Sequence, residues 1–349
     1  MSLAWVSASG GNIPSGAKPA GHEASSAGGQ QLYVARQTAV GYGQLLGKVR
    51  PGWTGAFFPY GGQELNLSSY EVLMNPTSYP NGYNPPGPNG ANWIGEPSVN
   101  PPTEHEGQGF VPPKFPNGTA YANTSNGLST AGNQVLEFHA IKCGEEQDGT
   151  PLFAALASYQ GGLHPGKVRV GLGGANISWG GAEIPGLNPY SVICDVSYGF
   201  VNGSPSGVPP NSMLCGTDDD GGELYIARSI GQLPGLQLGK ARPDGWGGNG
   251  CLISYAGKEV AVQTYQVLFM NGGGWGGNWV NASGGSIPDG AVALGCELDG
   301  TPLFAAKTNQ GAVGSGIQLG KVRHGFQGAY IPYNGNEVVV TDYWVLCAQ

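Results

Sequence analysis

The sequence predicts an all-β protein built from four homologous antiparallel β repeats, and three observations lead to this prediction. One five-residue stretch, LGKVR or a close variant, occurs four times; short apolar stretches bounded by Gly and Pro surround each copy; and no helical periodicity lasts three turns. The 349 residues include 64 Gly and 27 Pro, which suits short strands joined by tight turns. The 40% of hydrophobic residues supplies enough apolar surface for folded cores.

Each repeat contains the same elements in the same order. The five-residue stretch stands at residues 46–50, 165–169, 238–242 and 319–323. An apolar strand precedes it, QLYVAR in the first unit, and a hairpin with an aromatic residue, Gly and Glu follows it, PYGGQE in the first unit. The residues of PYGG and PYNG tolerate the positive φ of hairpin turns. Each unit then closes with a strand that begins with Tyr, such as YEVLM.

The repeats predict the domain boundaries. The four units are expected at residues 1–74, 121–197, 198–278 and 279–349. Residues 75–120 lie between the first two units and contain eleven prolines, so this segment is incompatible with a regular strand or helix. It is interpreted either as a flexible linker or as an ordered arm anchored by Trp93, Phe110 and Phe115.

Charge and composition exclude several classes of protein. The net charge of −8 gives no basic surface that would attract nucleic acid or an anionic membrane. The sequence contains no run of 18 apolar residues, so a membrane-spanning helix is not expected. The start MSLAWVSASGG does not resemble a signal peptide, so a cytoplasmic protein, or one released without a signal peptide, is expected. Six cysteines are then expected as buried thiols. Metal-ligand spacing is absent from the sequence, so neither a metal nor another cofactor is expected.

The order of these motifs resembles a known family. WVSASGGNIPSGA, an acidic residue, LYVAR, LGKVR, PYGGQE and YEVL follow one another as in the DM-nine repeat proteins, which include mannose-binding oyster lectins and the lectin portion of natterin-like proteins. The resemblance covers all four units and implies two tandem β-sandwich-like lectin modules, with units one and two in the first and units three and four in the second. No room remains for the pore-forming domain of the natterin-like proteins.

The resemblance also implies a sugar site in each unit. In the oyster lectins, an acidic residue before the LF or LY strand and the Lys of the GK pair hold the sugar. The matching positions here are Glu23 with Lys48, Glu146 with Lys167, Asp218 with Lys240, and Glu297 with Lys321. Three extra residues separate Glu23 from its strand, and the acidic position has rivals at Glu145 in unit two and at Asp219 and Asp220 in unit three.

The chemistry of these residue types supports a binding role. A carboxylate accepts from sugar hydroxyls and an ammonium donates up to three bonds. The alternative is a surface salt bridge worth roughly 0–1 kcal/mol, but the fourfold recurrence favours binding. Further recurring positions are the arginines, expected at a sugar or at a loop carbonyl, and aromatics that either stack on sugar or pack in the core. They are Arg50, Arg169, Arg242 and Arg323, and Trp53, Trp246 and Phe326, with Leu172 in unit two.

A last recurring position is the glutamate after each hairpin, which is expected to bind turn amides rather than a ligand. These glutamates are Glu64, Glu183, Glu259 and Glu337.

These observations favour a multivalent lectin that is not an enzyme. The predicted partners are mannose-type glycans or glycoproteins, bound without metal, and a homo-oligomer is compatible with this interpretation. The alternatives are a non-catalytic scaffold, in which the acid–lysine pairs are only salt bridges, and a glycosidase. The last needs two carboxylates across one cleft, whereas the recurring partner here is Lys.

Overall fold

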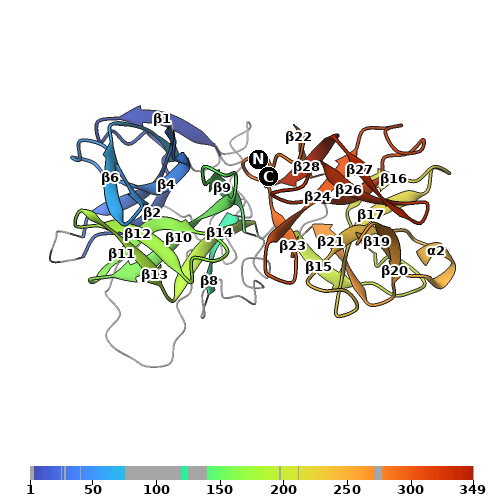
Figure 1. The fold of residues 1–349 in the computed structure, drawn as a ribbon. Coiled ribbons are helices and arrows are strands. Elements are labelled where there is room, and N and C mark those ends of the chain that lie inside the picture. Colours follow the sequence, from blue (N-terminus) through green and yellow to red (C-terminus); the bar gives the residue numbers. More distant parts are fainter. Residues whose placement is uncertain are drawn as a thin grey trace, which may run out of the picture.

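The computed structural model shows two modules of antiparallel β-strands, one blue to green and the other yellow to red in Figure 1. It describes residues 4–24, 26, 29–39, 41–74, 119–124, 140–195, 198–210, 212–270 and 277–348. The predicted all-β class and the two tandem modules are confirmed. The interpretations of residues 75–120, as a linker or as an arm anchored by Trp93, Phe110 and Phe115, lie outside the described residues except for the last two, which begin a strand.

Within the described residues, every unit contributes seven strands in matching order. The first unit holds β1 (Trp5–Ser9), β2 (Pro19–His22), β3 (Gln31–Ala39), β4 (Gly43–Val49), β5 (Ala56–Tyr60), β6 (Gln63–Leu67) and β7 (Ser69–Leu73). The second holds β8 (Thr119–Thr124), β9 (Lys142–Glu145), β10 (Pro151–Tyr159), β11 (Gly162–Val168), β12 (Ala175–Trp179), β13 (Ala182–Leu187) and β14 (Tyr190–Asp195).

The second module repeats this order. The third unit holds β15 (Tyr198–Asn202), β16 (Leu214–Thr217), β17 (Glu223–Ser229), β18 (Leu238–Ala241), α2 (Gly245–Gly248), β19 (Cys251–Tyr255), β20 (Lys258–Val262) and β21 (Tyr265–Met270). The fourth holds β22 (Asn278–Ser283), β23 (Ala293–Cys296), β24 (Pro302–Thr308), β25 (Leu319–Val322), β26 (Ala329–Tyr333), β27 (Asn336–Val340) and β28 (Asp342–Cys347).

The two units of each module interlock. Strand β2 of unit one pairs with β11 of unit two at His22 and Leu163, and β9 of unit two pairs with β4 of unit one at Glu145 and Gln44. Matching bridges join Thr217 to Ile317 and Leu236 to Cys296 in the second module. The segment that leads to the acidic residue of each unit is therefore held against the partner unit, beside that unit's lysine-bearing strand.

The hairpins of paired units also meet reciprocally. Their turns use positive φ at both central residues, as predicted from PYGG and PYNG; Asn334 and Gly335 have φ of 49° and 77°. The amide of Glu64 donates to the Gly181 carbonyl at 3.2 Å, and the amide of Glu183 donates to the Gly62 carbonyl at 3.2 Å. Residue i contacts j while j contacts i, as in an isologous dimer interface.

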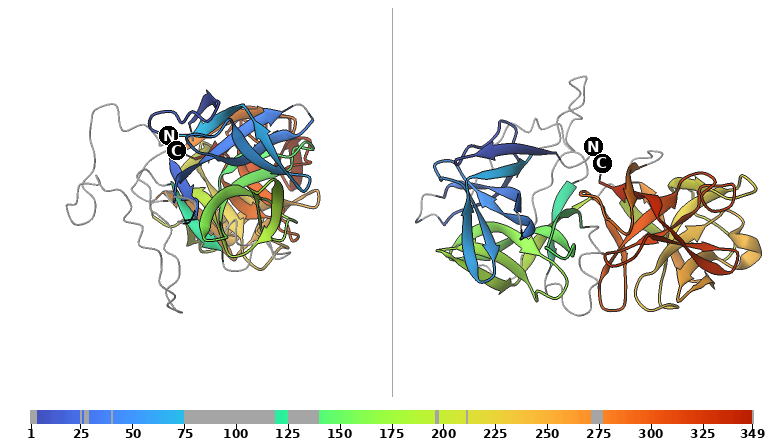
Figure 2. Two further views of the ribbon diagram at one scale, coloured as in Figure 1. Left: turned by 90° about the vertical axis from the view of Figure 1, so that its left-hand side faces the viewer. Right: turned by 45° about the horizontal axis from the view of Figure 1, so that its top comes forward.

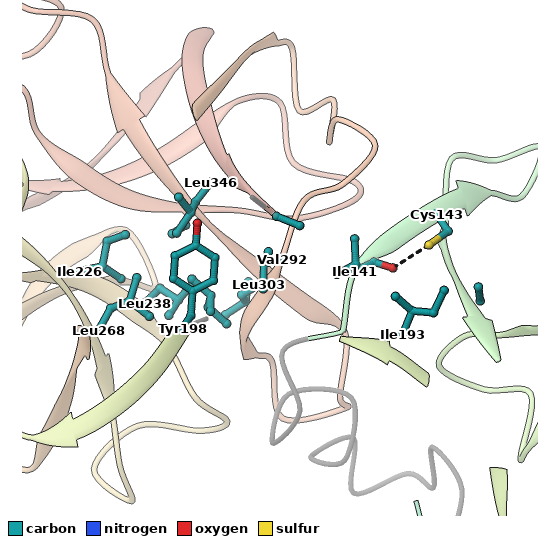
Figure 3. Packing of buried hydrophobic residues seen from close by; sticks show 14 of the residues in the cluster. Ile141, Cys143, Ile193, Tyr198, Ile226, Leu238, Leu268, Val292, Leu303 and Leu346 are labelled. Carbon is teal, nitrogen blue, oxygen red and sulfur yellow. Dashed lines mark hydrogen bonds between the residues drawn. The ribbon is translucent and has the colours of Figure 1, made fainter. Parts of the chain in front are cut away.

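One apolar core continues from the first module into the second (Figure 3). Ile141 forms an antiparallel bridge with Val292, and the amide of Lys142 donates to the Ala291 carbonyl at 3.0 Å. Tyr198 packs in the same cluster and donates its hydroxyl to the Cys347 carbonyl at 3.2 Å. The modules lie side by side in the views of Figures 1 and 2 and are joined by backbone hydrogen bonds as well as by apolar packing.

Charged side chains meet at the same contact. Asp289 of the second module accepts from Arg36 at 2.8 Å and lies 3.4 Å from the Lys142 Nζ atom. The Lys142 side chain is 3% exposed and also binds the Glu145 carboxylate at 2.8 Å and the Ile287 carbonyl at 2.7 Å. Because a buried charge is tolerated only when it is paired, these contacts are what allow Lys142 to lie inside.

The five cysteines whose side chains are described are buried thiols, namely Cys143, Cys215, Cys251, Cys296 and Cys347. Burial raises the pKa of Cys143 to about 12, so this thiol is unreactive at neutral pH. In the described part of the chain, no helix is both long and apolar enough to cross a bilayer.

Candidate functional site

The repeated lysine, arginine, acidic and aromatic residues gather in four places. We name them site 1 (Glu23, Lys48, Arg50, Trp53), site 2 (Glu146, Lys167, Arg169), site 3 (Asp218, Lys240, Arg242, Trp246) and site 4 (Glu297, Lys321, Arg323, Phe326). The structure brings the four predicted acid–lysine sets together within their own units, but it changes two details of the prediction.

The first change concerns the lysines, which are buried rather than exposed at the protein surface. The LGKVR stretch forms the end of strands β4 and β11, and it makes up the whole of the shorter strands β18 and β25, apart from its Arg. Each lysine therefore stands just before a strand end, and 2% to 4% of each residue is exposed. Lys240 shows why: its Nζ atom lies 5.8 Å from the Trp246 ring of its own unit and 5.6 Å from the Tyr333 ring of the partner unit.

The second change concerns the acidic residues, whose ionic partner in all four sites is the arginine. Arg50 lies 3.2 Å from Glu23, Arg169 3.2 Å from Glu146, Arg242 3.1 Å from Asp218 and Arg323 3.0 Å from Glu297. Arg323 also donates to the next carbonyl, that of His324, at 2.8 Å, which is the loop-carbonyl role expected for this arginine. Among the lysines, only Lys167 lies within 4 Å of its acidic residue in the described residues, at 3.5 Å from Glu146.

Their contacts distinguish the candidates for the acidic position in sites 2 and 3. Glu145 binds Lys142 at the module contact, which leaves Glu146 in site 2. In unit three, Asp218 and Asp220 both bind Arg242, whereas Asp219 accepts from the Tyr333 hydroxyl of unit four.

A residue that the sequence analysis missed links acid and lysine in the second module. Lys321 donates to the Gln237 side-chain oxygen at 2.5 Å, and the Gln237 amide donates to Glu297 at 2.7 Å. Reciprocally, Lys240 donates to Gln318 at 2.6 Å, and Gln318 donates to Asp218 at 3.1 Å. Each glutamine stands three residues before a lysine but serves the partner unit's site. The repeated QLGK was visible in the sequence, but its exchange between units was not.

The first module lacks these glutamines. The matching position in unit two is His164, whose Nδ1 atom lies 3.0 Å from the Lys48 Nζ atom. Burial, followed by the charge of Lys48, lowers the pKa of His164 to about 4. The neutral ring therefore accepts from Lys48 at Nδ1 and donates from Nε2 to the Tyr159 carbonyl at 3.2 Å. The matching position in unit one is the apolar Leu45, and Lys167 turns to Glu146 instead.

The glutamates after the hairpins bind turn amides, as expected, although the amides belong to the partner unit. Glu64 accepts from the Gly181 amide at 2.7 Å, and Glu183 accepts from the Gly62 amide at 2.9 Å. In the second module, the Gly335 amide donates to Glu259 at 2.7 Å and the Gly257 amide donates to Glu337 at 2.8 Å. One carboxylate oxygen of each glutamate thus fixes the pair of hairpins.

Aromatic rings line the cationic side chains. Arg50 lies 4.9 Å from the Trp53 ring, and Arg323 lies 4.2 Å from the Phe326 ring. Trp53, Trp246 and Phe326 are all half-buried, so each ring is partly exposed beside its site. The hairpin tyrosines of the partner units, which the sequence analysis treated only as turn residues, also reach the lysines; Tyr60 is 5.3 Å from Lys167 and Tyr255 is 5.6 Å from Lys321.

Burial changes the proton affinity of the lysines. Desolvation lowers the pKa of Lys48 and of Lys321 to about 8, although nearby carboxylates oppose the shift. The pKa of Lys240 is lowered for the same reason. Lys48 and Lys321 are still mostly charged at pH 7, and sites 1 and 4 therefore each offer a carboxylate acceptor beside two cationic donors. In the described residues, no group of three His, Cys, Asp or Glu side chains is placed to hold a metal ion.

The interlocked pairs of repeats and their four matching sites define a tandem-repeat β protein. The sequence profile of the DM9 repeat matches residues 1–67, 123–186, 148–245 and 234–340. The chain belongs to the DM9 repeat family.

Two other comparisons add little. The chain is similar to the crystal structure of the nematode sperm cell motility protein MFP2B, at 14% identity over 99% of this chain and 96% of that chain, with a TM-score of 0.33. A likeness this distant supports no conclusion about function. The comparison with curated proteins found no match.

Proposed function

We propose that this protein is a multivalent lectin that binds mannose or mannose-rich glycans at sites 1 to 4 without a metal ion. The observation that carries the proposal is the fourfold convergence of an acidic residue, an arginine and a buried lysine beside aromatic rings. Vicinal sugar hydroxyls both donate and accept, so they match a carboxylate flanked by cationic donors. The aromatic rings offer flat apolar faces to the C–H surface of a sugar.

The acid–arginine pairs do not argue against ligand binding. Their carboxylates are 15% to 23% exposed and the arginines 17% to 32%. A carboxylate has about four lone-pair positions, so a sugar hydroxyl can bind the same carboxylate without breaking its contact with the arginine. Burial has already removed water from the lysine of each site, and this lowers the desolvation cost when the lysine binds a sugar.

Binding suits the arrangement better than hydrolysis. A glycosidase needs a second carboxylate free to act as acid, base or nucleophile. A second recurring carboxylate lies beside each lysine, such as Glu337 beside Lys321, and one of its oxygens accepts from a turn amide of the partner unit. This tie supports a structural role for that glutamate.

Four sites on one chain suit recognition of repeated glycans on cell or microbial surfaces. A single sugar site of this kind binds weakly, but linked sites gain about 10²–10⁴-fold in avidity where geometry allows simultaneous engagement. A glycan array with purified protein, run with and without a chelator, tests the proposal. We expect signal on mannose-rich glycans that the chelator leaves unchanged. A blank array would favour the alternative, a non-catalytic scaffold in which the pairs are salt bridges.

A further inference from the structure

Sites 3 and 4 belong to the same module but differ at the residue that follows the acid. Asp219 follows Asp218 in site 3, and Leu298 follows Glu297 in site 4. The two sites otherwise share the bridging glutamine, the lysine, the arginine and a hairpin tyrosine from the partner unit. This one position can therefore be compared in nearly matched surroundings.

Asp219 accepts hydrogen bonds from two segments of unit four and so connects them across site 3. Its carboxylate accepts from the Tyr333 hydroxyl at 2.5 Å and from the Ser315 amide at 2.9 Å. Tyr333 in turn stands over Lys240, 5.6 Å from its Nζ atom. The hydrogen bond therefore fixes the ring that covers this lysine.

Site 4 has no equivalent of that bond. Leu298 is 74% exposed, and among the described residues the Tyr255 hydroxyl makes no hydrogen bond. An open pocket of about 440 Å³ lies here, lined by Glu297, Leu298, Asp299 and Arg323. A single exposed leucine is ordinary on a protein surface, but this one forms the apolar part of a wall that is otherwise charged.

The polar groups of this pocket are only partly used. Arg323 donates from Nε to Glu297 and from Nη1 to the His324 carbonyl. In the described part of the chain its Nη2 atom makes no hydrogen bond. One Asp299 oxygen accepts from the Thr301 amide at 2.9 Å. The pocket thus presents a guanidinium donor next to an exposed leucine, which matches a group with a carbonyl oxygen and a methyl group.

We propose that site 4 selects mannose-type sugars that carry an acetyl group, and that Leu298 determines this selectivity. The acetyl carbonyl accepts from Arg323, its methyl group packs against Leu298, and the ring hydroxyls face Glu297 and Asp299. Site 3 lacks the apolar contact and binds the acetylated and the unmodified sugar about equally. This inference rests on the proposed lectin function and adds the ligand class of one site.

The test reads each site separately by backbone amide NMR, with signals of residues 297–301 for site 4 and 218–222 for site 3. The ligands are acetyl-ester-bearing mannan oligosaccharides and the same preparation after mild alkaline deacetylation. Mannose and N-acetylmannosamine form a second pair that separates acetyl esters from acetamides. We expect about fivefold tighter binding of the acetylated ligand at site 4, the gain from burying one methyl group, and no such gain at site 3.

Two variants assign the effect to Leu298. Leu298→Asp, which copies site 3, should bring the ratio of the two affinities at site 4 to about one, and Asp219→Leu should raise that ratio at site 3. A ratio near one in the wild type, or a preference that persists in Leu298→Asp, overturns the inference while binding of the unmodified sugar still supports the lectin. Failure of every ligand at every site removes both proposals.

Discussion

Lys48 and Lys321 show how one side chain couples burial to binding. Each is covered by aromatic rings or partner residues and is bonded directly to a neutral group, His164 or Gln237. A neutral partner offsets less of the desolvation cost than a carboxylate would, and the pKa of both lysines falls to about 8. The ammonium that a sugar would use is therefore present only up to mildly alkaline pH.

This shift predicts opposite pH dependences for binding and stability. The pKa of a lysine in the unfolded chain is about 10.4, so between pH 8 and that value the unfolded state binds more protons. The free energy of unfolding should then rise with pH over this window, by roughly 1–3 kcal/mol per lysine, while mannose affinity at sites 1 and 4 falls. Calorimetry and urea unfolding from pH 7 to 10 measure both. Lys48→Met with Lys321→Met should flatten the stability rise; an unchanged rise would contradict the assignment.

At the scale of single elements, the turn after β1 and its counterpart after β22 support the aromatic loops of sites 1 and 4. A Cβ atom on Gly285 would lie 1.8 Å from the Phe326 carbonyl oxygen, and Gly11 has the same relation to Trp53. Gly284 has a φ of 60° but no atom within 4 Å of an added Cβ. The pair Gly284 and Gly285 therefore separates backbone strain from steric clash.

We expect Gly284→Ala to cost about 1–2 kcal/mol, the strain of a left-handed residue. Gly285→Ala should cost about 1–3 kcal/mol more because its methyl group meets backbone. It should also weaken sugar binding at site 4 by displacing Phe326. Urea unfolding and NMR titration of both variants provide the measurements. Equal losses in the two variants would show that the turn does not support the loop.

The elements also show what the sequence can and cannot predict. Strand order, positive-φ hairpins and the acid, lysine and arginine positions follow from local patterns that recur four times. The roles of Gln237, Gln318 and His164 do not, because each serves a site in the other unit of its module. The burial of the lysines was missed for the same reason: the hairpin rings that help to cover Lys167, Lys240 and Lys321 come from the partner unit.

At the scale of the whole molecule, Asp289 connects the two modules through Arg36 and the buried Lys142. Asp289→Ala should lower the free energy of unfolding by about 1–3 kcal/mol, because Lys142 loses one of its anionic neighbours, and should separate the unfolding of the modules in calorimetric scans. Ser15 occupies the matching position of unit one and is exposed, so Ser15→Ala is the control. Unfolding of the Asp289→Ala variant identical to that of the control would show that the pairs contribute nothing to the module contact.

The most direct test of the central claim is calorimetric titration of methyl α-mannoside into the wild type and into a variant with all four acids neutralised, Glu23→Gln, Glu146→Gln, Asp218→Asn and Glu297→Gln. These substitutions keep side-chain shape and leave the lysines in place, and thermal unfolding verifies the fold. Losing a charged hydrogen bond costs about 1.5–3 kcal/mol, so we predict affinities ten- to hundredfold weaker in the variant. Equal heats of binding in the two proteins, or no binding to the wild type, would contradict the assignment of sites 1 to 4 as sugar sites.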